Sequence, residues 1–81
     1  TKGSPIFKGQ VSQTDCVAFE RMRAAGAIFI GRTNSPEFGL GGHTYNEVYG
    51  TTRNAFDPSR SAGGSSGGAA VSVALDVAAP A

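Results

Sequence analysis

The sequence has 81 residues, which is enough for one small domain with a modest core. Its net charge of +1 provides neither a basic stripe for nucleic acid nor a cationic patch for a membrane surface. The single cysteine, Cys16, cannot form an internal disulfide, no apolar run approaches the roughly 18 residues of a membrane span, and no signal-peptide pattern is present. We therefore expect a cytoplasmic protein. The 12 glycines and the abrupt ends of the chain lead us to expect a piece of a larger domain.

The first helix is predicted to follow the turn-rich residues 1–10. Ser12 and Asp15 have the spacing of a capping box, and Asp15 suits the positive end of a helix dipole. The apolar face of this helix would consist of Ala18, Phe19, Met22 and Ala25. Gly26 then provides a left-handed stop.

The next segments indicate an α/β protein. Residues 27–30, AIFI, form a continuous apolar run, which predicts a strand buried on both faces of a parallel or mixed sheet. Residues 31–64 read as one long loop, and such loops are uncommon in compact proteins unless they are functional. A second helix, built from small apolar residues and buried on all sides, is predicted over 67–75. Residues 77–81 would begin another strand.

The stretch GGSSGG, residues 63–68, admits three interpretations. As a flexible linker it would lead into a new domain, but an apolar helix follows. As an anion cradle at a helix start it lacks the Gly-Lys-Ser/Thr of a P-loop. As a catalytic turn it would present a serine that needs a neighbouring base. His43 is the single histidine, and a lone histidine in a polar loop more often lies at the surface or braces the loop.

Four ordered motifs resemble one enzyme family. These are GSPIFKG at residues 3–9, AAGAIFIGRTN at 24–34, the loop GRTNSPEFGLGGHTYNEVYGTTRN that begins at Gly31, and GGSSGGAA at 63–70. Together they are similar to the core of the amidase signature family, the serine amidohydrolases that use a Ser-Ser-Lys triad. The resemblance implies that residues 1–81 are a partial amidase signature domain. Its α/β fold would be a mixed β-sheet core covered by helices, with a long active-site loop.

The resemblance also implies roles for particular residues. Ser65 would be the bridging serine, on a cis peptide, which passes a proton between the nucleophilic serine and an unprotonated lysine. Ser66 would support this network through hydrogen bonds or cap the following helix. Gly39 and Leu40 match the acyl-binding side of the site, or else form an ordinary turn with one buried leucine. The lysine would lie upstream of Thr1 and the nucleophile beyond Ala81, and no metal or organic cofactor is implied.

Other loop residues are expected to be structural. Asn34 would brace the loop, Asp57 and Pro58 would form a turn, and Arg53 and Arg60 would be structural or solvent-facing. One departure from the family is Ser61-Ala62 in place of a proline before the glycines, and another is Asp76 where a glycine is common.

The expected activity of the whole protein is hydrolysis of a small-molecule carboxylic amide to acid and ammonia or amine through an acyl-enzyme. No nucleic-acid contact is evident. One alternative is the amidase-type subunit of a glutamine-dependent tRNA amidotransferase, and another is a non-catalytic glycine-rich relative. The 81-residue chain by itself is expected to be inactive and poorly folded, because its predicted strand has no partners within the segment.

Overall fold

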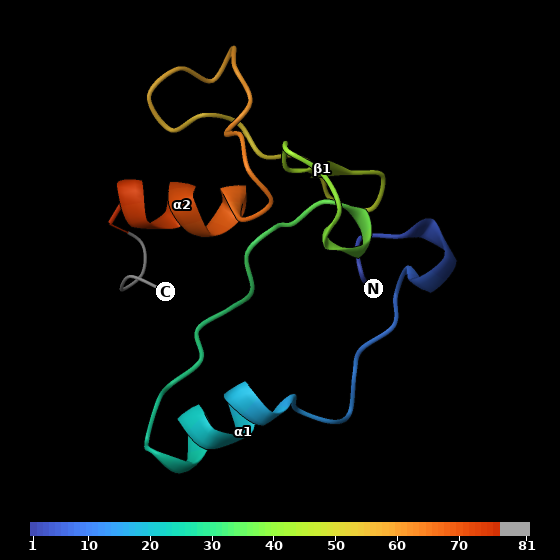
Figure 1. Cartoon of the computed structure of the whole chain (residues 1–81), viewed down its shortest axis with the longest axis vertical. Helices are drawn as coiled ribbons and strands as arrows, with labels where there is room; N and C mark the ends of the chain where they lie inside the picture. The colour runs from blue at the N-terminus through green and yellow to red at the C-terminus, as the bar shows by residue number, and fades with distance from the viewer. Residues whose placement is uncertain (77–81) are drawn as a thin grey trace.

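The computed structural model describes residues 1–76. Their elements follow in the order η1 (Pro5–Phe7), α1 (Val17–Ala24), η2 (Glu37–Gly39), β1 (Tyr45–Asn46), β2 (Gly50–Thr51) and α2 (Gly67–Ala74), where η1 and η2 are single turns of 3₁₀ helix. In Figure 1, α1 lies at one end of the molecule, whereas β1 and α2 lie at the other. Neither helix in this part of the chain is long and apolar enough to cross a membrane.

Helix α1 starts later than the capping box predicts. The Ser12 hydroxyl donates to the Thr14 carbonyl at 2.9 Å and accepts from the Thr14 amide at 3.4 Å, so it bonds its own turn rather than a helix start. Such local bonds compete with capping. The helix begins at Val17, its N-cap Cys16 provides no side-chain cap, and Asp15 instead pairs with Arg23 at 3.1 Å.

The end of α1 confirms the predicted stop. Gly26 has φ +95°, and its amide donates to the Arg23 carbonyl at 3.0 Å. The Ala27 amide donates to the Met22 carbonyl, also at 3.0 Å. This pair of bonds across a left-handed residue is a Schellman motif.

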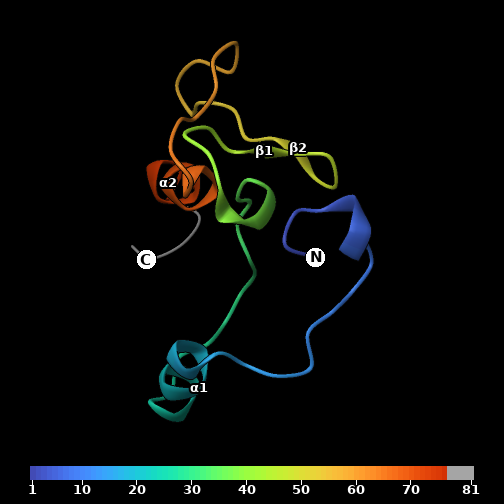
Figure 2. The same ribbon diagram turned by 45° about the vertical axis from the view of Figure 1, so that its right-hand side comes forward.

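Residues 27–30 do not form the predicted buried strand. The side chains of Ile28 and Ile30 are 88% and 75% exposed, and the backbone is an extended connection from α1 towards η2, which Figure 2 shows from a second side. Phe29 packs on Phe19 at 5.3 Å between ring centroids. A strand buried on both faces needs hydrogen-bonded neighbours and covering helices. The described residues supply neither, and the expected mixed sheet is not among them.

The long loop contains more structure than the sequence predicts. Strands β1 and β2 form an antiparallel hairpin in which Tyr45 pairs with Thr51 and Asn46 with Gly50. An isolated bridge between Arg53 and Ser61 closes a second, wider loop. A short hairpin was missed because its strands are only two residues long and carry no apolar alternation.

The wider loop holds the predicted turn at Asp57. The Asp57 carboxylate accepts hydrogen bonds from the Ser59 hydroxyl at 2.6 Å and the Ser59 amide at 3.1 Å, and it pairs with Arg60 at 3.1 Å. These bonds, those from Ser59 first, hold the pKa of Asp57 below its usual value. Arg53 and Arg60 are both exposed, as expected.

Helix α2 starts at Gly67, as predicted, and its last helical residue is Ala74. It is not buried on all sides, because Gly67 is its single buried residue. The reason is that no apolar side chain is buried among residues 1–76, so the helix has no apolar core to enter. The strand predicted over 77–81 lies outside the described residues.

What the chain does bury is polar. Ser4 and Thr44 are completely buried and Asn46 is 6% exposed. Buried polar groups need hydrogen-bond partners to offset the cost of leaving water. The contacts of Thr44 and Asn46 therefore show what the centre of this structure holds in place.

Candidate active site

The two predicted catalytic serines lie in the turn that enters α2. Ser65 and Ser66 are both exposed to solvent. Gly63 and Gly64, directly before them, have φ of +75° and +69°, a left-handed conformation that glycine adopts without strain. The described residues contain no cis peptide bond, which contradicts the cis peptide expected at Ser65. Two consecutive left-handed glycines make the chain reversal in its place.

Thr44 ties this serine turn, defined as residues 63–67, to the hairpin. Its hydroxyl donates to the Gly64 carbonyl at 2.7 Å and accepts from the Gly67 amide at 2.9 Å. The Gly64 amide in turn donates to the Gly42 carbonyl at 2.6 Å. One buried side chain thus holds the backbone on both sides of the serine pair.

The capping role considered for Ser66 is wrong in this structure. Ser66 is the N-cap residue of α2 but makes no side-chain cap hydrogen bond. Thr44, more than twenty positions away in the sequence, accepts the bond from the Gly67 amide that a cap side chain would take. The Ser66 hydroxyl is therefore not committed to the helix start.

The second glycine pair is needed because other backbone comes close. A Cβ at Gly67 would lie 2.8 Å from the Thr44 Cβ, and one at Gly68 would lie 2.8 Å from the Asn34 carbonyl oxygen. Any side chain at these positions would force its neighbours apart. The two halves of GGSSGG therefore have different tasks, which are chain reversal before the serines and close packing after them.

Asn34 and Asn46 extend the support beneath the turn. Asn34 donates to the Gly50 carbonyl at 3.2 Å and to the Thr52 hydroxyl at 3.0 Å, which confirms that it braces the loop. The Asn46 amide donates to the Asn34 side-chain oxygen at 2.7 Å and to the Ser35 carbonyl at 2.8 Å. The Asn46 oxygen accepts from the amides of Val48 and Tyr49 at 3.0 and 2.7 Å.

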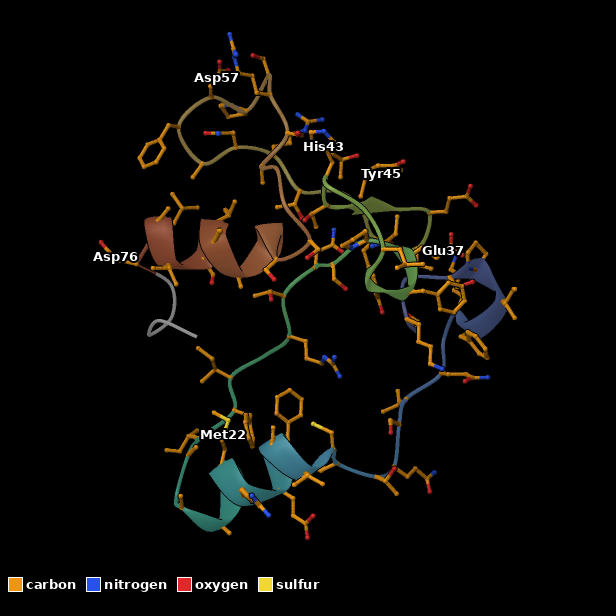
Figure 3. The ribbon with its side chains drawn as sticks, in the orientation of Figure 1. Met22, Glu37, His43, Tyr45, Asp57 and Asp76 are labelled. Carbon is orange, nitrogen blue, oxygen red and sulfur yellow. The ribbon has the colours of Figure 1, made fainter. Side chains whose placement is uncertain are left out.

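His43 braces the loop rather than serving the serine turn. Its Nδ1 lies 2.9 Å from the Ser61 hydroxyl, and the ring is exposed. Figure 3 shows His43 and Tyr45 close to β1, with Asp57 at the far end of the wider loop. This position agrees with the expectation for a lone histidine in a polar loop.

The predicted acyl-binding residues lie on the segment that precedes the hairpin. Gly39 has φ +73° and ends η2, and Leu40 is 78% exposed, so the alternative of a turn with one buried leucine is wrong. Gly42, two residues further on, accepts the hydrogen bond from Gly64. The backbone therefore connects this segment directly to the serine turn.

Sequence reasoning missed Thr44 and Asn46. Both belong to one face of the β1 strand, because residues two apart in a strand point the same way, and Tyr45 between them is 63% exposed. An alternation of buried and exposed positions was thus present, but its buried members are polar. The one readable signal was Asn46 in NEVYG, since asparagine side chains often bond the backbone two residues on.

These features define a turn with fixed ends that presents two adjacent hydroxyls at a helix start, which excludes a flexible linker. The amidase family model matches residues 1–81, and the chain belongs to the amidase family.

Particular relatives are more similar still, and those named here are all subunits of a glutamyl-tRNA(Gln) amidotransferase that bear the same name. The one from Syntrophobacter fumaroxidans is 49% identical over 77 residues, which are 95% of this chain and 16% of that protein. The one from Thermus thermophilus is 42% identical over 96% of this chain and 17% of its own length. The one from Treponema pallidum (strain Nichols) is 50% identical over 91% of this chain and 15% of its own length. The chain thus spans about one-sixth of the curated relatives it matches.

Proposed function

We propose that the protein containing this chain cleaves a carboxylic amide through an acyl-enzyme, with Ser65 as the bridging serine. The observation that carries the proposal is the family match over the whole chain, which includes the serine turn. The geometry supports it, since the turn is fixed by hydrogen bonds on both sides while Ser65 and Ser66 stay accessible. A relay serine needs both properties.

The proposed chemistry begins with a nucleophilic serine, which the resemblance places beyond Ala81. As this serine attacks the amide carbonyl, the Ser65 hydroxyl accepts its proton and passes its own proton to a neutral lysine. The lysine proton then returns through Ser65 to the leaving nitrogen, the C–N bond breaks, and an ester to the nucleophile remains. Water hydrolyses the ester by the same relay. Ser66 stabilises the network by hydrogen bonding.

The lysine must be neutral to accept this proton. Burial lowers the pKa of a lysine because it penalises the charged form. The resemblance places the lysine upstream of Thr1, so its surroundings belong to the rest of the domain.

The names of the relatives favour the amidotransferase alternative over a free-standing amidase. Three of them, at 42–50% identity, are named as subunits of a glutamyl-tRNA(Gln) amidotransferase. On this proposal the amide is glutamine, the released ammonia is transferred to glutamyl-tRNA(Gln), and the partners are further subunits together with that tRNA. Leu40 and Gly39 then contact the acyl part of the amide.

The test uses the full-length protein with its partner subunits. We expect Ser65→Ala to lower kcat for ammonia release from glutamine by about 10²- to 10⁴-fold, the usual range for a lost proton-transfer group. Ser72→Ala is the matched control, because Ser72 lies on the same helix but bonds only the Ala69 carbonyl within its own turn, at 2.7 Å. Wild-type kcat in the Ser65→Ala variant would overturn the relay role.

The choice between the two activities depends on the substrate. The amidotransferase proposal predicts that glutamine is the preferred amide and that adding glutamyl-tRNA(Gln) yields amidated tRNA. Fast hydrolysis of simple amides, with no amidated tRNA formed, would favour a free-standing amidase.

A further inference from the structure

The Thr44 side chain lies at the one place from which both ends of the serine pair are held. Thr44 is completely buried. Its hydroxyl has one proton to donate, and the Gly64 carbonyl receives it at 2.7 Å. The hydroxyl oxygen accepts the Gly67 amide at 2.9 Å. Gly64 precedes Ser65 and Gly67 follows Ser66, so the two bonds bracket the serines.

The platform that carries this hydroxyl is itself fixed. The Thr44 carbonyl accepts the Thr52 amide at 2.9 Å, and the Thr52 carbonyl accepts the Ala62 amide at 3.1 Å. The chain from 62 into the turn is therefore attached to the hairpin at both Ala62 and Gly64. The packing of Gly67 against the Thr44 Cβ, described above, leaves no room for Thr44 to turn away.

We propose that Thr44 is a positioning residue that sets the location of the Ser65 hydroxyl by holding the backbone on either side of the serine pair. The inference rests on the proposed function of Ser65. Thr44 touches neither substrate nor the reacting atoms, so it acts through the serine turn. Proton relay is sensitive to such placement, because a shift of about 1 Å in a reacting group can cost about 100-fold in rate.

The test compares two replacements of Thr44 in the full-length protein with its partner subunits. Thr44→Val keeps the shape but removes the hydroxyl, whereas Thr44→Ser keeps the hydroxyl. We expect Thr44→Val to lower kcat for amide hydrolysis by about 10- to 100-fold, with KM changed by less than about threefold. Thr44→Ser should restore kcat to within about threefold of wild type, because both hydrogen bonds can form.

Thr52→Val is the matched control. It removes a threonine hydroxyl from the same hairpin, one that accepts a hydrogen bond from Asn34 at 3.0 Å but does not contact the serine turn. A general loss of stability would affect both valine variants alike. The positioning role predicts that kcat falls only in Thr44→Val.

The outcomes separate this inference from the proposed function. If Ser65→Ala retains activity, the relay role fails, whatever Thr44 does. If Ser65→Ala is inactive while folded Thr44→Val keeps wild-type kcat, only the positioning role is overturned. Thr44→Ala provides a second hydroxyl-free variant. Should neither hydroxyl-free variant fold, the inference is also overturned, because Thr44 would then hold the domain rather than the serine turn.

Discussion

At the scale of single residues, the steric fit of Gly68 distinguishes this helix start from an ordinary glycine-rich segment. Glycine is unfavourable inside helices, and replacing it with alanine normally stabilises an exposed helix by about 1 kcal/mol. Here a Cβ at Gly68 would lie 2.8 Å from the Asn34 carbonyl oxygen and 3.0 Å from the Thr33 Cβ. Backbone neighbours cannot swing aside as a flexible side chain can. The steric effect therefore opposes the propensity effect.

We predict that Gly68→Ala destabilises the full-length protein by about 1–3 kcal/mol, the usual cost of overpacking. Urea denaturation of the purified protein measures this change. Gly42→Ala is the control, because a Cβ there meets nothing within 4 Å in the described chain and its φ lies outside the left-handed region. A stabilised Gly68→Ala protein would mean that helix propensity dominates and that Asn34 does not approach α2 as described.

Prediction from sequence at this scale succeeded where a residue's role follows from its own chemistry. Gly26 as a helix stop and Asp57 as a turn residue are local effects, and both were confirmed. Thr44 was missed because its partners, Gly64 and Gly67, are distant in the sequence. No local pattern shows which remote backbone groups a threonine will reach.

At the scale of elements, Asn46 is the main support of the β1–β2 hairpin. All of its polar capacity is used, since its amide group donates twice and its oxygen accepts two backbone amides. It is also 6% exposed, so water cannot replace lost partners easily. Removing it leaves the Asn34 oxygen and two amides without their partner.

We predict that Asn46→Ala destabilises the full-length protein by about 2–4 kcal/mol, because several buried polar groups lose their partner at once. Asn54→Ala is the matched control. The Asn54 oxygen also accepts two backbone amides, those of Phe56 and Asp57, but both bonds are exposed to solvent. Its loss should cost less than about 1 kcal/mol. Equal effects of the two substitutions in thermal unfolding would show that burial of Asn46 does not matter.

The helices were predictable and the strand was not, for a physical reason. Gly26 ends α1 and the small-residue run from Gly67 forms α2 through contacts within a few residues along the chain. The run at 27–30 depends on strands and helices that must come from elsewhere. Its apolar composition indicates a buried environment, but composition alone does not supply the neighbours.

At the scale of the whole molecule, the described residues are held together by polar contacts and not by an apolar core. No apolar side chain is buried among them, and large ones remain exposed, including Val11, Ile28, Ile30, Leu40 and Phe56. Each hydrogen bond contributes about 1 kcal/mol net, whereas ordering the backbone costs about 1–2 kcal/mol per residue. Hydrophobic burial normally offsets this cost, and here it is missing.

We therefore predict that a polypeptide of residues 1–81 does not fold cooperatively by itself. Its thermal denaturation should show no sigmoidal transition, and its amide proton resonances should be poorly dispersed. The full-length protein is the control, in which the rest of the amidase domain would cover the exposed apolar side chains and give these residues a cooperative transition. A sharp transition in the isolated chain would mean that the polar network around Thr44 and Asn46 suffices for folding. The serine turn would then be preformed before the remainder of the domain packs against it.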